Sequence, residues 1–172
     1  MRRWMILTLV TLALTLPALA AGNWRQARLV VVPGRQAGPI RLGQPLSPEV
    51  FRVLGRPSVQ QAPEPGPEGM DTGNVSWGGE AATELWLGIN AKLNDGRGDQ
   101  NVFTVYLVGV RAITDRGVFI GCDLARARRA YPEARRGEPS EMDEGAVFLE
   151  VPGLVMVFRE GRLAEMVVRP RS

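Results

Sequence analysis

The chain has 172 residues, with 21 Lys and Arg against 18 Asp and Glu, and a formal net charge of +3. It contains no histidine and one cysteine, Cys122. The lack of histidine removes the usual general base and the commonest metal ligand, and a single cysteine excludes an intramolecular disulfide. These two absences exclude His-based catalysis and a disulfide-stabilised scaffold.

Residues 1–20 have the pattern of a cleavable export signal. Arg2 and Arg3 precede an apolar run over residues 4–16, and Ala18-Leu-Ala20 is an Ala-x-Ala cleavage site. An uncleaved membrane anchor is the alternative. Without the two leading arginines the chain is nearly neutral, so no nucleic-acid partner is expected. We expect an exported bacterial protein, periplasmic or extracellular, with no stable membrane span after cleavage.

Residues 21–113 are predicted to form a first α+β unit. Apolar runs at 28–32 and 40–42 indicate short strands, and Gly43 provides a turn. A helix follows over residues 46–54, where apolar residues recur at helical spacing and Ser47 is placed to cap the free amides.

The rest of this unit is expected to be a Pro-rich loop followed by strands. Residues 58–73 are rich in proline and glycine and predict an exposed, extended loop, with a Pro-rich ligand for a partner as the alternative. Three strands are predicted at 74–78, 84–90 and 102–111, with a hairpin loop over 91–100.

Residues 114–172 are predicted to repeat the same order of elements. Gly121 provides the turn, Asp123 is a good cap, and a helix is expected over residues 124–131. A polar loop is expected at 137–144. Three strands follow, at 146–151, 154–159 and 163–169.

The agreement between the halves predicts an α+β fold of two tandem strand-helix-antiparallel-meander repeats. The apolar stripe of each helix needs a sheet to cover. We therefore expect the helices to pack on one face of a curved antiparallel sheet.

Three short motifs carry a family resemblance: Ile40-Arg-Leu-Gly43, Leu54-Gly-Arg-Pro57, and the closing strand from Phe158 to Val168. Over most of residues 38 to 169 the pattern resembles the repeat of the BamE/SmpA outer-membrane assembly lipoproteins and of the tandem-repeat β-lactamase inhibitor protein. The resemblance implies helices on a curved antiparallel sheet and action through protein contacts. Neither a lipobox cysteine nor the cysteine pairs of the inhibitor are present, so no functional residue is transferred.

The candidate partner-binding residues are Trp86, Tyr106 and Thr104. If Phe103, Val105 and Leu107 face the core, Thr104 and Tyr106 point away from it beside Trp86. Exposed aromatic residues on a sheet are frequent anchors of protein interfaces. The alternative is that a loop or the other half covers this face.

A possible basic patch lies on and after the second predicted helix. Arg126, Arg128 and Arg129 are followed by Arg135 and Arg136, and could receive an acidic partner or a phosphate-bearing glycan. The acidic residues over 138–144 provide the alternative, a solvated face that compensates its own charge.

No catalytic residue, metal or cofactor is predicted. Asn94, Asp95 and Asp99 lack the spacing of a calcium loop. Cys122 begins the second helix, where the helix dipole would lower a thiol pKa, but no histidine is available as a partner base. We read Cys122 as a half-buried structural residue, with an intermolecular disulfide as the alternative.

The sequence favours a non-enzymatic, exported module that binds another envelope or secreted protein, inhibitor-like or envelope-assembly-like. Two alternatives stay open. One is an envelope hydrolase that uses carboxylates, and the other is a structural homodimer linked through Cys122.

Overall fold

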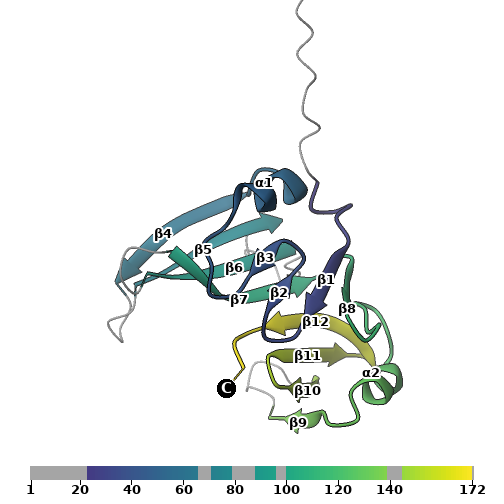
Figure 1. Ribbon diagram of the computed structural model, residues 1–172. Helices are drawn as coiled ribbons and strands as arrows, with labels where there is room; N and C mark the ends of the chain where they lie inside the picture. The colour runs from purple at the N-terminus through teal and green to yellow at the C-terminus, as the bar shows by residue number, and fades with distance from the viewer. Residues whose placement is uncertain (1–22, 66–70, 79–87, 96–99, 139–144, 172) are drawn as a thin grey trace, which may run out of the picture.

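The protein has an α+β fold in the computed structural model, which describes residues 23–65, 71–78, 88–95, 100–138 and 145–171. Two short helices accompany two sheets, a four-stranded mixed sheet and an eight-stranded antiparallel sheet (Figure 1). The predicted export signal, Trp86 and Asp99 lie outside the described residues.

The four-stranded sheet is built almost entirely from the first predicted unit, and only Thr114, at the end of its last strand, belongs to the second. Its strands are β1 (Leu29–Val32), β2 (Gln36–Ala37), β3 (Ile40–Arg41) and β8 (Ala112–Thr114). The strand order is β3-β2-β1-β8, and the pairing of β1 with β8 is parallel. The first predicted strand, at 28–32, is confirmed as β1, whereas β8 was not predicted.

The eight-stranded sheet holds most of the chain in the order β4-β5-β6-β7-β12-β11-β10-β9. Its strands are β4 (Val59–Pro65), β5 (Asp71–Gly78), β6 (Gly88–Asp95), β7 (Gln100–Val108), β9 (Arg135–Gly137), β10 (Val147–Val151), β11 (Leu154–Arg159) and β12 (Arg162–Val168). The antiparallel pairing of β7 with β12 joins the N-terminal half of the sheet to the C-terminal half.

The helices α1 (Pro48–Leu54) and α2 (Leu124–Ala130) begin differently. Asp123 caps α2 as predicted, because its side chain accepts a 2.7 Å hydrogen bond from the Arg126 backbone N–H. Ser47 occupies the N-cap position of α1 as predicted, but its side chain makes no capping hydrogen bond. Both helices follow a turn at a glycine with positive φ, 73° at Gly43 and 95° at Gly121, as expected from the sequence.

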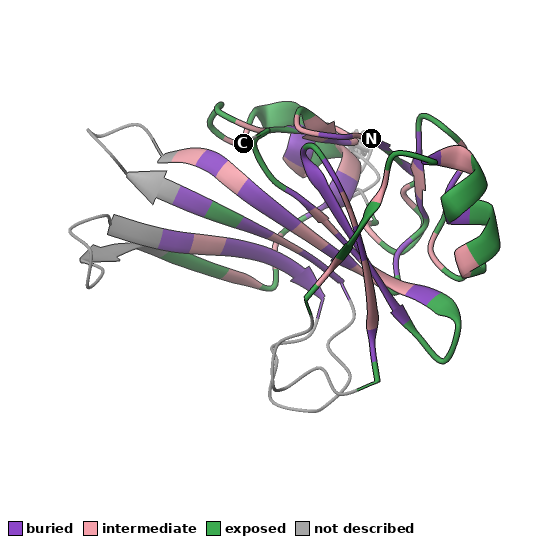
Figure 2. Ribbon diagram, turned by 90° about the horizontal axis from the view of Figure 1, so that it is seen from below, coloured by how far each residue is buried: buried purple, intermediate pink, exposed green. Residues whose placement is uncertain are grey.

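One hydrophobic core is shared by both helices and both sheets. Alternate strand residues face it, which gives the banded pattern of buried and exposed positions along the strands (Figure 2). Trp77 of β5 belongs to this core and is fully buried. Its Nε1–H donates a 2.9 Å hydrogen bond to the carbonyl oxygen of Gly55, so the polar end of the ring is satisfied.

The predicted loop over residues 58–73 is wrong where the structure describes it. Residues 59–65 form β4 at one edge of the large sheet, and β5 begins at Asp71. Pro63 and Pro65 are accommodated because an edge strand leaves one side of its backbone unpaired. Pairing is irregular between Gln61 and Glu64, next to the first proline. Each half therefore contributes four strands to this sheet, not three.

Two further predictions fail around the β6–β7 hairpin. Residues 91–95 belong to β6, not to a loop, and of the predicted strand at 84–90 only residues 88–90 are described. Phe103 does not share the core face with Val105 and Leu107. A bulge pairs Lys92 with Thr104 and the next residue, Leu93, with Val102, so Val102 takes the core position.

Candidate functional site

A row of cross-strand neighbours crosses the outer face of the large sheet, the face opposite the core. Tyr106 of β7 pairs with Asn90 of β6 on one side and with Val167 of β12 on the other. Val167 pairs with Val155, and Val155 pairs with Glu150. Tyr106 therefore lies where the two halves of the sheet meet.

The outer face changes character at Tyr106. Towards β5 it carries polar residues: Ser76 of β5 pairs with Asn90 of β6, and Asn74 pairs with Lys92. Towards β10 it carries a second hydrophobic cluster, separate from the core: Ala146, Phe148, Val155, Val157 and Val167. No residue of α1, α2 or the four-stranded sheet belongs to this cluster among the described residues. The helices and the small sheet therefore do not cover this cluster, which lies on the opposite face of the large sheet.

The cluster forms the floor of a hollow of about 320 Å³. Val155 and Val157 are buried, and Phe148, Val167 and Tyr106 are half-buried around them. Its lining residues are Tyr106, Glu138, Phe148, Glu150, Val155, Val157, Glu165, Val167 and Arg169. An apolar floor inside a charged rim is the arrangement found at many protein interfaces. We call this hollow and its rim the Tyr106 face.

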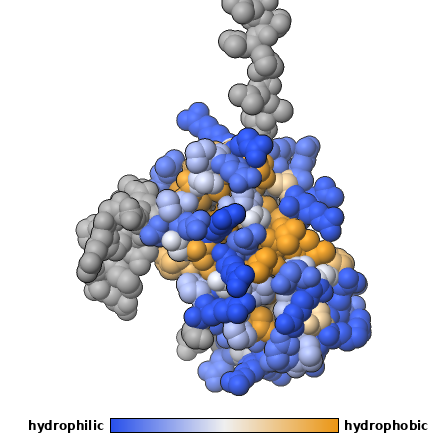
Figure 3. Space-filling model, viewed as in Figure 1, coloured by the Kyte–Doolittle hydropathy of each residue, from blue (hydrophilic) through white to orange (hydrophobic). Residues whose placement is uncertain are grey.

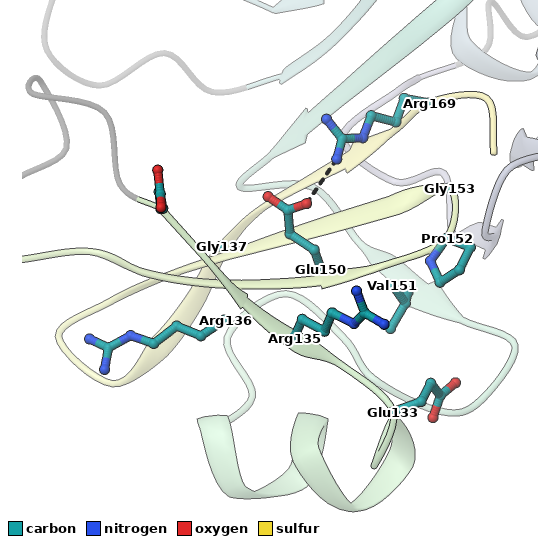
Figure 4. A pocket seen from close by; sticks show the side chains of 10 residues that line it. Glu133, Arg135, Arg136, Gly137, Glu150, Val151, Pro152, Gly153 and Arg169 are labelled. Atoms are coloured by element: carbon teal, nitrogen blue, oxygen red, sulfur yellow. Dashed lines mark hydrogen bonds and ion pairs between the residues drawn. The ribbon is translucent and has the colours of Figure 1, made fainter. Parts of the chain in front are cut away.

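A wider charged groove of about 770 Å³ adjoins the Tyr106 face along β9 and β10 (Figure 4). The two hollows share Glu138, Glu150 and Arg169. At their boundary the Arg169 guanidinium donates a 2.9 Å hydrogen bond to Glu150. This ion pair is half-exposed, so we expect it to rearrange easily when a partner binds.

The remaining charges of the groove come from β9 and the end of α2. Arg135 and Arg136 extend from β9 in different directions (Figure 4), and neither forms an ion pair with a described residue. Glu133 is engaged by Arg116 at 2.7 Å. A backbone hydrogen bond and this arginine hold the pKa of Glu133 below its ordinary value. The Glu133 carboxylate is therefore ionised near neutral pH and paired with Arg116.

Two of the three predicted binding residues can be placed. Tyr106 is half-buried on the Tyr106 face, and the Lys92 Nζ lies 5.1 Å from its ring centroid. Thr104 lies on the same side of the sheet, two residues along β7, but is only 8% exposed. Trp86 lies outside the described residues. Tyr106 is therefore partly accessible to a partner, whereas Thr104 has almost no exposed surface for contact.

The predicted basic patch is divided. Arg126, Arg128 and Arg129 are exposed on α2, but Arg126 is used locally: its Nε donates a 3.0 Å hydrogen bond to the Gly117 carbonyl. Arg135 and Arg136 lie on β9 in the charged groove, not on the helix. The five arginines therefore do not form one patch on one element.

Cys122 does not have the environment of a reactive thiol. It is 3% exposed, and burial raises the pKa of its thiol, against the lowering expected from the helix dipole. Desolvation by burial is the largest influence on this pKa, and a backbone hydrogen bond and the nearby Arg126 lower it only in part. Tyr131, at the other end of α2, is buried too. Burial raises its pKa to about 12, and its hydroxyl donates a 3.2 Å hydrogen bond to Asp115.

Phe148, Val155, Val157 and Val167 were not predicted from the sequence as site residues. Residues 154–158 are apolar without interruption, and all five are buried. A strand that is apolar on both faces needs cover on both faces. That run was the available signal for a second hydrophobic surface.

Comparison with family models, curated proteins and solved structures finds no match to this chain. Within the described residues, no helix is long and apolar enough to cross a membrane. The same residues contain no cluster of three or more Cys, Asp or Glu side chains that could hold a metal ion.

Proposed function

We propose that this protein is an exported, non-enzymatic module that binds another protein through the Tyr106 face. The observation that carries the proposal is the second hydrophobic cluster, which lies on the sheet face opposite the core and is rimmed by charged residues. Apolar clusters that line a hollow outside the core and are rimmed by polar residues commonly mark interaction sites.

Tyr106 supports the proposal by its chemistry and position. Its ring lies at the border of the apolar cluster, and the Lys92 ammonium lies over it. Tyrosine provides a large contact area at a low cost in conformational entropy and is enriched among interface anchors. Beside it, Asn90 Oδ1 is buried and has no hydrogen-bond partner among the described residues. An unsatisfied buried oxygen is uncommon in folded proteins, and it marks this part of the face as unusual.

The order of elements supports a tandem duplication, which we propose as the finer description of the fold. A strand, a glycine turn, a seven-residue helix and four strands occur twice, first from β3 to β7 and then from β8 to β12. Strand order in the large sheet is mirrored about the β7–β12 pair. The resemblance to the assembly-lipoprotein and inhibitor repeats remains part of this proposal, as does export to the periplasm or medium.

The enzyme alternative receives no specific support from the site. Glu133 has a lowered pKa and is held by Arg116, which is the wrong direction for a general acid. Glu150 is held by Arg169. The homodimer alternative would require the buried Cys122 thiol to become accessible.

The test compares what the full chain and its variants retain from envelope and culture-medium extracts. The binding variant is Tyr106→Ala/Phe148→Ser, two half-buried positions of the Tyr106 face, and the control is Arg52→Ala on the exposed side of α1. We expect a protein retained by the parent and the control to be lost with the binding variant. The retained protein is then purified, and its affinity for all three chains is measured.

Loss of a hot-spot aromatic residue is expected to weaken that affinity by about 30-fold or more. Circular dichroism and the thermal midpoint must show that the binding variant is folded. Equal retention by parent and folded binding variant would remove the Tyr106 face from the proposal, and retention of nothing by the parent would remove protein binding itself.

A further inference from the structure

A second apolar surface lies on the outer face of the four-stranded sheet. Among the described residues, Val30 and Phe119 are the large hydrophobic side chains that stay exposed, at 46% and 40%. They are not scattered. Val30 pairs with Ile113 across β1 and β8, and Ile113 forms a bridge with Phe119. These three residues make a continuous row, which we call the apolar row.

Three of the described arginines lie next to this row: Arg28 and Arg111 beside its β1 and β8 residues, and Arg126 beside Phe119. Arg28 and Arg111 directly precede Leu29 and Ala112, which are register partners, so two like charges stand next to each other on parallel strands. Both are exposed, and neither has an ion-pair partner among the described residues. Arg126 stacks on Phe119, with its guanidinium carbon 5.0 Å from the ring centroid.

A hollow of about 330 Å³ lies between the arginines and the row. It is lined by Arg28, Val110, Arg111, Ala112, Ile113, Phe119 and Ile120. Among its described lining residues there are two arginines and no Asp or Glu. In the space-filling view an orange area, bordered by blue, covers the region of β1 and β8 (Figure 3).

We propose that the apolar row is a docking surface for an acidic segment of a partner protein that carries one large apolar side chain. Adjacent like charges on neighbouring strands are unfavourable, so carboxylates placed between Arg28 and Arg111 would relieve their repulsion and could bind them bidentately. The hollow beside Ile113 and Phe119 would receive the apolar side chain. This surface is on a different sheet from the Tyr106 face and does not depend on it.

Two other occupants fit the charges less well. A second copy of the chain in a symmetric contact would bring the arginines of both copies together. An anionic membrane surface is usually held by a larger set of basic residues together with an inserted helix or acyl chain, whereas this surface provides three arginines around three apolar side chains. Both occupants are outcomes of the test.

The probes are four degenerate dodecapeptide pools, immobilised separately and exposed to the full chain. One pool is acidic with a single phenylalanine, one is acidic with serine in its place, one is basic with phenylalanine and one is neutral with phenylalanine.

The chain is used as wild type, Arg28→Ser/Arg111→Ser and Phe119→Ser. The matched control is Arg52→Ser/Arg56→Ser, which removes the same charge from exposed positions around the end of α1.

We expect the acidic phenylalanine pool to bind the wild type best. Its affinity should fall about tenfold or more with each variant of the row and stay unchanged with the Arg52→Ser/Arg56→Ser control. Replacing phenylalanine by serine in the pool should cost a similar factor. All variants change exposed side chains, so thermal midpoints should match the wild type.

Three results would overturn the proposal. The first is equal binding of the acidic, neutral and basic pools, or equal binding by the Arg28→Ser/Arg111→Ser variant. The second is binding to phosphatidylglycerol vesicles that requires Arg28 and Arg111, without binding to the peptides. The third is a dimer in sedimentation that Phe119→Ser dissociates, which would assign the row to a second copy. If the Tyr106→Ala/Phe148→Ser variant retains the same proteins as the parent, the proposed function fails, but the three results above keep their meaning for the apolar row.

Discussion

Gly34 and Gly153 meet backbone to backbone, although they belong to different sheets. The Gly34 N–H donates a 2.9 Å hydrogen bond to the Gly153 carbonyl oxygen. A Cβ atom on Gly153 would lie 2.3 Å from the Gly34 Cα. This contact fixes the β1–β2 turn of the small sheet against the β10–β11 turn of the large one.

The first prediction concerns this contact. Gly153→Ala should destabilise the protein by about 3 to 5 kcal/mol, because it adds a backbone clash to the strain of an alanine at φ 85°. Gly161→Ala, with φ 75° and nothing within 4 Å of its added Cβ, should cost only the strain, about 1 to 2 kcal/mol. Urea unfolding of both variants measures the difference. An equal loss of stability in the two variants would show that the close contact between the two turns does not add to the effect of Gly153→Ala.

The two helix caps give a matched pair. Asp123→Ala should lower the free energy of unfolding by about 1 kcal/mol, since it removes the 2.7 Å hydrogen bond to the Arg126 N–H. Ser47→Ala should change it by less than about 0.5 kcal/mol, because the Ser47 side chain makes no capping bond. Chemical unfolding of the two variants tests this. A loss at Ser47 as large as that at Asp123 would contradict it.

The raised pKa of Tyr131 leads us to expect that the protein loses stability at high pH. The Tyr131 pKa is raised by burial from 10.0 to about 12, so the unfolded chain releases this proton first. The stability that the neutral hydroxyl contributes is complete below pH 10 and is lost as the pH rises towards 12, by up to about 2 to 3 kcal/mol.

The Tyr131→Phe variant measures that contribution. At neutral pH it should be about 1 kcal/mol less stable, since the bond to Asp115 is lost. Between pH 10 and 12 its unfolding midpoint should fall less than that of the wild type. If the two chains lose stability in parallel, Tyr131 is not the titrating group.

Cys122 should react with a thiol reagent only when the chain opens. The side chain is 3% exposed and its pKa is raised, so the native rate should be on the order of a hundredfold or more below that in urea. A non-reducing gel should show monomer. Rapid native modification, or a reducible dimer, would revive the structural role through a disulfide.

The C-terminal strands were the part of the fold most readily predicted from the sequence. Pro152-Gly153 and Glu160-Gly161 separate three apolar runs, and β10, β11 and β12 end within a residue or two of the predicted limits. The Asp123 cap and the two glycine turns were likewise predictable, because each depends on a few neighbouring residues.

Predictions failed where a strand's place in the sheet mattered more than its composition. Residues 59–65 looked like a loop because of their prolines, but an edge strand accepts proline on its unpaired side. Phe103 was assigned to the core by alternation, and the bulge opposite Lys92 and Leu93 shifts that alternation by one residue.

The sequence by itself determined the local features: the α+β class, the glycine turns, the cap at Asp123 and the lack of a histidine-based centre. The turns and the cap are each set by residues a few positions apart, whereas the class follows from the pattern of the whole chain and the lack of a histidine-based centre from its composition. Only the tertiary structure decided that Tyr106 adjoins Val167, and that Val30 and Phe119 share one row with Ile113. Those surfaces arise from pairings between strands far apart in the chain, whose register is not fixed by a short connecting turn as it is in a hairpin.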